Sequence, residues 1–147
     1  MAFQDNPHVI RWRLNLRSPI EKVYRALATD AGRAAFWAET AVAANGIIHF
    51  EFPNGYTWDG KILKAQPPHT FAVQYIDQSI ATFILKADGH GGTNLTLTDE
   101  GVAKQHRNEV IAGWVFVLLA LKAAVDFGVD LRNHNPDHTW EIGFVEN

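Results

Sequence analysis

KQHRNEVIAGWVFVLLALKAAVDFGVDLR, residues 104–132, is the stretch that decides the fold, because its pattern predicts one long helix. Its apolar residues recur at steps of three and four, which places them on one stripe of a helix with about 3.6 residues per turn. They are Val110, Ile111, Trp114, Val117, Leu118, Leu121, Val125 and Val129. The chain before it mostly predicts short strands, so we expect the helix Lys104–Arg132 to lie across a curved antiparallel sheet. The space between helix and sheet is then either a filled core or a pocket.

The first part of the chain predicts a strand followed by two short helices. Residues 8–17 alternate between apolar and polar side chains, as in a half-buried strand. Residues 18–21, with the sequence SPIE, predict a helix start in which Ser18 is the N-cap and the glutamate completes a capping box. We expect Asp30 to cap a second short helix that ends near Trp37.

The middle of the chain predicts β-hairpins, and one of them can be aligned residue by residue. Two alternating segments within residues 46–66 are joined by a Pro-Asn-Gly turn. In the expected register Phe50 lies opposite Trp58 and His49 opposite Asp59, which pairs aromatic with aromatic and base with acid. Three further strands are expected at residues 70–76, 79–87 and 93–99.

This order of elements predicts the fold class α+β. We expect a curved antiparallel sheet of about six strands, with two short helices and the long C-terminal helix gathered on one face. The 147 residues are expected to form a single domain spanning positions 1–147.

Composition excludes several classes of function. The net charge of −3 and the scattered basic residues indicate no nucleic-acid partner. With no cysteine, the chain can form neither a disulfide nor a thiolate metal site. Residues 1–9 contain no apolar signal-peptide core, and the apolar run between Glu109 and Lys122 is judged too short to span a bilayer. We therefore expect a cytoplasmic protein with no membrane insertion.

A set of aromatic side chains is predicted to face the space under the long helix, and these are the candidate site residues. They either fill a core or line a pocket for a flat or lipid-like ligand, oriented by the Tyr75 hydroxyl or a tryptophan N–H. Together with three aliphatic neighbours, the candidate ligand-binding residues are Trp37, Phe50, Trp58, Phe71, Val73, Tyr75, Phe83, Trp114, Leu118 and Leu121.

We assign no catalytic residue, metal site or cofactor. His49 is expected on the outer face of its hairpin, as a solvated partner of Asp59. His134 and His138 are separated by Asn-Pro, which breaks any helix that would bring them together. The inward polar groups that a catalytic alternative could use are Tyr75 and Lys64. Adjacent acids point to opposite sides of a strand, and we expect Glu100, next to Asp99, to cap the approach to the long helix.

The long helix carries more apolar surface than one stripe. A second row is formed by Val115, Phe116, Leu119 and Ala123, of which the first three are the candidate dimer contacts. These residues must meet other elements of the chain or a second copy, so a homodimer through them is a hypothesis. Trp140, in the C-terminal tail, is expected to pack back on the body.

Residues that carry a family resemblance are spread along nearly the whole chain. They are Ser18–Tyr24, Phe36-Trp37, Gly60 with Pro67-Pro68, Leu97–Val102 and Gly113-Trp114. In order and spacing they resemble the START-like superfamily (SRPBCC, the helix-grip fold). Within it they most resemble the branch of the activator of heat-shock-protein-90 ATPase homologue, in its C-terminal-type domain. The resemblance implies a cavity between sheet and long helix that in relatives holds lipids, sterols, polyketides or other apolar molecules.

The function we expect is the binding of a small apolar or amphipathic ligand of lipid, polyketide or aromatic type in that cavity. Two alternatives remain open. One is an enzyme of cyclase or hydratase type that uses the same pocket, and the other is a co-chaperone-like interaction module in the stress response.

Overall fold

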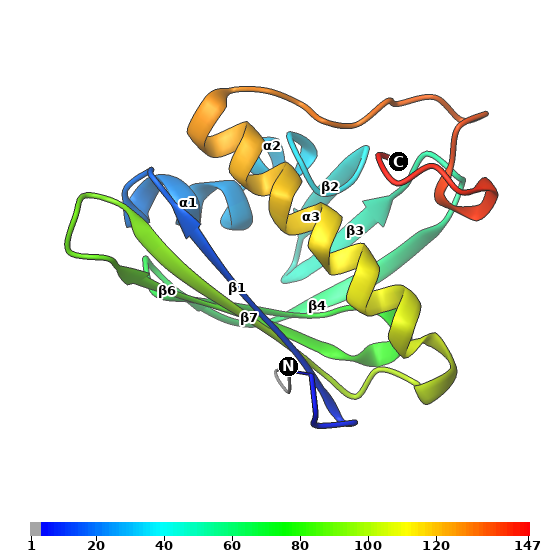
Figure 1. Cartoon of the computed structure of the whole chain (residues 1–147), viewed down its shortest axis with the longest axis horizontal. Coiled ribbons are helices and arrows are strands. Elements are labelled where there is room, and N and C mark those ends of the chain that lie inside the picture. Colours follow the sequence, from blue (N-terminus) through cyan, green and yellow to red (C-terminus); the bar gives the residue numbers. More distant parts are fainter. Residues whose placement is uncertain (1–3) are drawn as a thin grey trace.

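The computed structural model describes residues 4–147 and shows an antiparallel sheet curved around one long helix (Figure 1). Residues 1–3, which begin the stretch where we expect no signal peptide, lie outside the described residues. In chain order the elements are β1 (Val9–Leu16), α1 (Ile20–Ala28), α2 (Asp30–Ala34), β2 (Thr40–Ala44), β3 (Ile47–Glu51), β4 (Thr57–Gln66), β5 (Thr70–Gln74), η1 (Ile76–Gln78), β6 (Ile80–Ala87), β7 (Thr93–Glu100), η2 (Lys104–His106), α3 (Arg107–Phe127) and η3 (Trp140–Ile142).

The α+β helix-grip architecture is confirmed, with one more strand than expected. The sheet has seven strands in the order β1-β7-β6-β5-β4-β3-β2, so the first strand pairs with the last. The strand missed from the sequence is β2, which pairs with β3 at the edge of the sheet. Its sequence is Thr-Ala-Val-Ala-Ala, and small side chains give too little contrast between the two faces for alternation to be visible.

The predicted register of the β3–β4 hairpin is confirmed. Phe50 lies opposite Trp58 and His49 opposite Asp59. His49 Nδ1 lies 2.6 Å from an Asp59 carboxylate oxygen on the outer face. The aromatic pair occupies the opposite, inner face, as expected from alternation.

Both predicted helix caps are wrong, because the polar side chains find partners farther along the chain. Ser18 does not cap α1. Its hydroxyl instead donates to the Asp126 carboxylate at 2.8 Å and ties the start of α1 to the end of α3. Thr29 caps α2 by accepting from the Gly32 N–H, while Asp30 accepts from the Arg33 guanidinium. Ser, Thr and Asp are all favoured at the N-cap, so the sequence alone does not show which of them caps a helix. Here the contacts that Ser18 and Asp30 make elsewhere decide the outcome.

The long helix is shorter than predicted at both ends. α3 ends at Phe127 because Gly128 adopts a left-handed conformation (φ 64°) and its N–H returns to the carbonyls of the last turn. Residues 104–106 form a separate 3₁₀ turn, and Glu100 is the exposed end of β7 and caps neither helix. Beyond Gly128 the chain returns along α3 toward the β3–β4 hairpin (Figure 1).

The segment Lys104–Phe127, at 24 residues, is longer than the uncharged run between Glu109 and Lys122 and is apolar enough to cross a membrane by length and composition alone, a test that a buried core helix also passes. In the fold one side of it packs on the sheet through Trp114, Leu118 and Leu121. We therefore assign it as the core helix.

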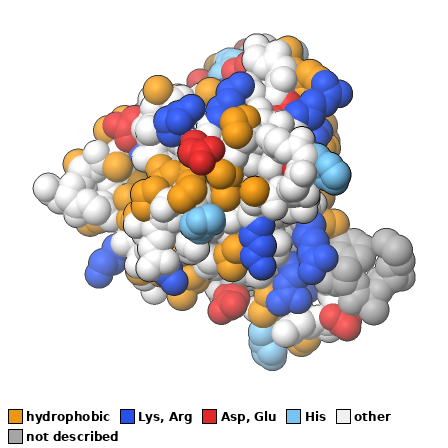
Figure 2. Space-filling model, turned by 90° about the vertical axis from the view of Figure 1, so that its left-hand side faces the viewer, with side chains coloured by type: hydrophobic (Ala, Val, Ile, Leu, Met, Phe, Trp, Pro, Cys, Tyr) orange, Lys and Arg blue, Asp and Glu red, His pale blue; other side chains and the backbone are white. Residues whose placement is uncertain are grey.

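The face at the left of Figure 1 is shown in Figure 2. Apolar side chains gather near its centre, with basic, acidic and His side chains interspersed around them. Exposed apolar groups on this scale are ordinary for a protein surface.

Candidate functional site

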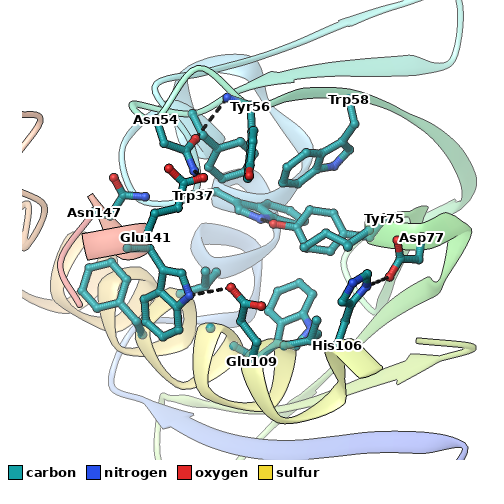
Figure 3. A pocket seen from close by; sticks show the side chains of 18 of the residues that line it. Trp37, Asn54, Tyr56, Trp58, Tyr75, Asp77, His106, Glu109, Glu141 and Asn147 are labelled. Atoms are coloured by element: carbon teal, nitrogen blue, oxygen red, sulfur yellow. Dashed lines mark hydrogen bonds and ion pairs between the residues drawn. The ribbon is translucent and has the colours of Figure 1, made fainter. Parts of the chain in front are cut away.

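A pocket of about 730 Å³ lies between the first half of α3, the β3–β4 hairpin, η1 and the C-terminal tail (Figure 3). The structure therefore contains both of the expected arrangements. The second half of α3 covers a filled core, whereas the first half stands over the pocket.

Four of the ten candidate residues line this pocket: Trp37, Trp58, Tyr75 and Trp114. The ring centroids of Tyr75 lie 5.0 Å from Trp114, 5.1 Å from Trp58 and 5.5 Å from Trp37. These separations are typical of favourable aromatic packing. The four rings form a continuous aromatic floor built from β4, the end of β5, α3 and the turn after α2.

The other six candidates are packed beneath that floor and do not line the pocket. Each is at most 4% exposed, and the six are Phe50, Phe71, Val73, Phe83, Leu118 and Leu121. The Trp37 ring lies 5.1 Å from Phe50 and 5.5 Å from Phe83, so the floor separates these core side chains from the pocket. The apolar periodicity of the strands and of α3 identifies which side chains face the interior, but not how far each lies from the cavity.

The indole N–H groups of the floor are directed to partners within the protein. Trp37 donates to the Tyr75 hydroxyl at 2.9 Å, and Trp114 donates to the Asp99 carboxylate at 2.8 Å. Burial raises the pKa of Tyr75, so its hydroxyl keeps its proton across the physiological range. Among the described residues Trp58 Nε1 has no hydrogen-bond partner, and it is shielded from solvent.

Asp99 is the inward acid that sequence reasoning missed. It is fully buried, and burial raises its pKa, an effect that the Trp114 N–H and the Ser79 hydroxyl partly oppose. The sequence did contain a signal for this. Asp99 lies two residues after Leu97 and four after Leu95 in the same strand, so its side chain points to the same inner face. Lys64, the inward cation we considered, is exposed instead.

Asp99 does not line the pocket, because the Trp114 indole lies between it and the cavity. Its other oxygen, Oδ1, is buried close to the Ser79 hydroxyl, which helps to hold the pKa of this carboxyl down. The carboxyl therefore orients Trp114, and it has no path to a bound molecule.

Polar groups gather at the mouth of the pocket. The His106 imidazole contacts the Asp77 carboxylate at 2.6 Å, and the Trp140 indole N–H donates to Glu109 at 2.9 Å. The tail brings Glu141 to the mouth near Asn54 (Figure 3), and Trp140 of the same turn also lines the pocket. The sequence predicts that Trp140 packs back on the body, and the structure places it in the pocket wall.

The second apolar row of α3 divides between two environments. Phe116, which we assigned to a dimer surface, lines the pocket instead. Val115 and Leu119 are 39% and 49% exposed and lie on the solvent side.

Within residues 4–147 no three His, Asp or Glu side chains are arranged so that they could hold a metal ion. His134 is held between the carboxylates of Glu39 and Asp130, at 2.7 and 2.6 Å, and forms no site with His138.

A curved antiparallel sheet that holds one long helix over a lined cavity defines a helix-grip, START-like protein. The family model described as Activator of Hsp90 ATPase homolog 1-like protein matches residues 17–126, and the chain belongs to this family. No curated protein matches the sequence.

Several solved structures share the fold. The Aha1 dimer from Colwellia psychrerythraea is 25% identical with a TM-score of 0.71, over 82% of this chain and 97% of that one. SSP2350 from Staphylococcus saprophyticus is 19% identical with a TM-score of 0.72, over 84% and 96% of the two chains. CalU16 from Micromonospora echinospora is 22% identical with a TM-score of 0.65, over 78% of this chain and 72% of that chain.

Proposed function

We propose that the protein binds a small apolar or amphipathic molecule in the pocket between α3 and the sheet. The observation that carries this proposal is an aromatic-lined cavity of about 730 Å³ in a chain of the helix-grip class. Ligand pockets usually enclose about 300–1,000 Å³ and are lined mostly by apolar and aromatic groups. Membership of the family makes ligand binding plausible and leaves the ligand's identity open.

Binding is driven by the burial of apolar surface. Each Å² of apolar surface removed from water contributes roughly 25 cal/mol, against which association loses translational and rotational freedom. The floor rings already pack against one another, so little reorganisation is needed. The Tyr75 hydroxyl, which accepts from Trp37, retains its own proton as a donor for a ligand oxygen.

The enzyme alternative has weaker support. A cyclase or hydratase needs an acid or base that touches the bound molecule. Asp99 is separated from the pocket by Trp114, and the raised pKa of Tyr75 makes its hydroxyl a poor base at neutral pH. The co-chaperone alternative rests on the family description alone. A cytoplasmic location belongs to the same proposal, because nothing in the composition requires an oxidising compartment.

The proposal is tested by a substitution on α3 that adds a side chain to the pocket and so reduces its volume. Gly113 lines the cavity, and a Cβ atom there would meet no atom within 4 Å, so Gly113→Leu places the start of its side chain in open space. It also improves helix propensity, which keeps the variant folded. The matched control is Ala112→Leu, which adds the same side chain on the exposed side of the same turn.

The experiment screens a library of uncharged aromatic and aliphatic compounds by thermal shift. We expect a subset to raise the melting temperature of the parent and of Ala112→Leu, because a ligand selective for the folded state stabilises it. The same compounds should shift Gly113→Leu less, because its side chain takes up part of the cavity. A library with no active compound, or equal shifts in both variants, would contradict the proposal.

We also propose a homodimer whose interface contains Val115 and Leu119 but no longer Phe116, which lines the pocket. Val115 and Leu119 are exposed apolar neighbours on α3, and one solved relative is described as a dimer. Sedimentation velocity should show a dimer for the parent and a monomer for Leu119→Lys, whereas Val42→Lys, which replaces an equally exposed residue on β2, should remain dimeric. A parent that stays monomeric at high concentration rejects this interface.

A further inference from the structure

The mouth of the pocket carries charges of mainly one sign. Four acids line it, together with a single histidine and no lysine or arginine. Two of the acids have basic partners, since Asp77 contacts His106 and Asp59 contacts His49, each at 2.6 Å. The other two, Glu109 and Glu141, form no ion pair with a basic side chain within residues 4–147.

The partners of Glu109 and Glu141 are neutral donors. Glu109 accepts from the Trp140 indole N–H at 2.9 Å. Glu141 accepts from the Asn54 side-chain amide at 3.5 Å, and its carboxylate raises the pKa of Tyr56 by hydrogen bonding to that hydroxyl. Such donors orient the two carboxylates without pairing either with a positive charge, and Glu109 interacts only at longer range with His106, which is already paired with Asp77.

The two carboxylates come from different elements but act on the same neighbours, since Glu141 and then Glu109 raise the pKa of Tyr56, and Trp140, the chain neighbour of Glu141, donates to Glu109. Glu109 projects from the first turn of α3, and Glu141 from the 3₁₀ turn of the tail (Figure 3). The rings of Tyr56 and Trp140 are part of the pocket lining. Aromatic faces attract a cation electrostatically, and low-dielectric walls strengthen the field of charges at the rim of a cleft.

We infer that the pocket selects an amphipathic cation, with its ammonium group at Glu109 and Glu141 and its apolar body on the aromatic floor. This inference rests on the proposed ligand-binding function and specifies the class of ligand. A carboxylate ligand such as a fatty acid meets like charge at the mouth and finds no lysine or arginine in the lining to offset it. A neutral amphiphile has the apolar contacts alone.

The test compares three compounds with the same tail and different heads: octyltrimethylammonium, octanoate and octyl glucoside. Their affinities are measured by isothermal titration calorimetry below the micelle-forming concentration of each. We expect octyltrimethylammonium to bind about tenfold more tightly than octanoate, because each of two partly exposed carboxylates contributes a factor of a few. Octyl glucoside should fall between them.

The variant that isolates the charges is Glu109→Gln/Glu141→Gln. An amide oxygen still accepts the hydrogen bonds from Trp140 and Asn54, so the geometry of the mouth is kept. In this variant the cation and the anion should bind about equally, and the affinity for octyl glucoside should stay unchanged. The control Glu21→Gln/Glu100→Gln makes the same change in net charge at exposed positions outside the pocket and should keep the preference for the cation.

The outcomes separate this inference from the proposal on which it rests. Octanoate binding as tightly as the cation, or a preference that survives Glu109→Gln/Glu141→Gln, overturns the selection of cations and leaves ligand binding intact. If none of the three compounds binds, the inference is overturned. The pocket itself is then judged by the uncharged library and Gly113→Leu.

Discussion

At the scale of single residues, Trp114 connects the filled part of the interior with the hollow part. Its ring lies 5.0 Å from Tyr75 in the pocket floor and 5.8 Å from Phe83 in the core. Its N–H donates to the buried Asp99 carboxylate. The residue is 2% exposed, although one edge belongs to the pocket lining.

We predict that Trp114→Ala lowers the free energy of unfolding by roughly 3–5 kcal/mol, because it removes a buried ring and enlarges the cavity. Trp114→Phe should lose less, since it keeps a ring and removes the hydrogen bond to Asp99. Urea denaturation measures both values. A loss for Trp114→Ala below about 1 kcal/mol would show that the ring is not part of the packed interior.

Asp99 should make stability depend on pH in an unusual direction for a carboxyl. Burial raises its pKa in the folded state above the ordinary 3.8. The folded protein therefore holds this proton more tightly than the unfolded chain does, and the contribution of this group to stability falls as pH rises from 3.8 through the raised value.

We predict that Asp99→Asn unfolds at a higher temperature than the parent at pH 7, because it removes a buried charge and keeps an acceptor for Trp114. Its advantage should shrink as pH falls toward 4, because the raised pKa lets the buried carboxyl of the parent take up a proton more readily than an ordinary one. Melting curves across this range test it, with the exposed Asp137→Asn as control. An advantage that does not change with pH would contradict the assignment.

At the scale of elements, local signals were sufficient for the β3–β4 hairpin and for the long helix. The Pro-Asn-Gly turn and the pairing of Phe50 with Trp58 set the register without any distant contact. The elements that the sequence did not predict depend on distant contacts. β2 is defined by its pairing with β3, and Ser18 is drawn from its cap position by Asp126 at the far end of α3.

Two glycines in different elements have opposite roles. At Gly60 in β4 a Cβ atom would come within 2.3 Å of the Gln74 carbonyl oxygen, whereas at Gly113 in α3 it would meet nothing. We predict that Gly60→Ala lowers the free energy of unfolding by roughly 1–3 kcal/mol through this clash. Gly113→Ala should raise it by about 1 kcal/mol through helix propensity. Equal effects in a denaturation experiment would contradict the close approach of β4 to β5.

The tail is fastened by a charged cluster beside α2. The Arg132 guanidinium donates to the Ala38 carbonyl at 2.7 Å, and His134 lies between the carboxylates of Asp130 and Glu39. Hydrogen bonds to Asp130 and then Glu39 raise the pKa of His134 in the folded state. The contribution of this group to stability is therefore complete below its ordinary pKa of 6.5 and is lost as pH rises through the raised value.

We predict that the tail, residues 133–147, loses protection from hydrogen exchange as pH rises from about 6 to 9, after correction for the intrinsic rate. His134 is partly exposed, so the change should be less than about fivefold. In His134→Gln the protection should be lower and insensitive to pH in this range. Unchanged protection in the parent would show that the cluster does not hold the tail.

At the scale of the whole molecule, the interior divides along α3 into a core and a pocket. The sequence predicts which residues face the helix, and all ten candidates are buried or partly buried on that side. It could not show which of them border a cavity, because that depends on the curvature of the sheet and on where the tail lies. Trp140 and Glu141 enter the site only through the path of the tail.

The central claim is that the space beneath the first half of α3 receives one molecule of ligand. Native mass spectrometry of the freshly purified protein, repeated after addition of uncharged ligands found by thermal shift, tests it most directly. We predict a mass increase of one ligand per chain in the parent and a lower liganded fraction in Gly113→Leu, whose side chain takes up part of the pocket. Parent protein that keeps its unliganded mass under every condition, or an equal liganded fraction in Gly113→Leu, would contradict the account.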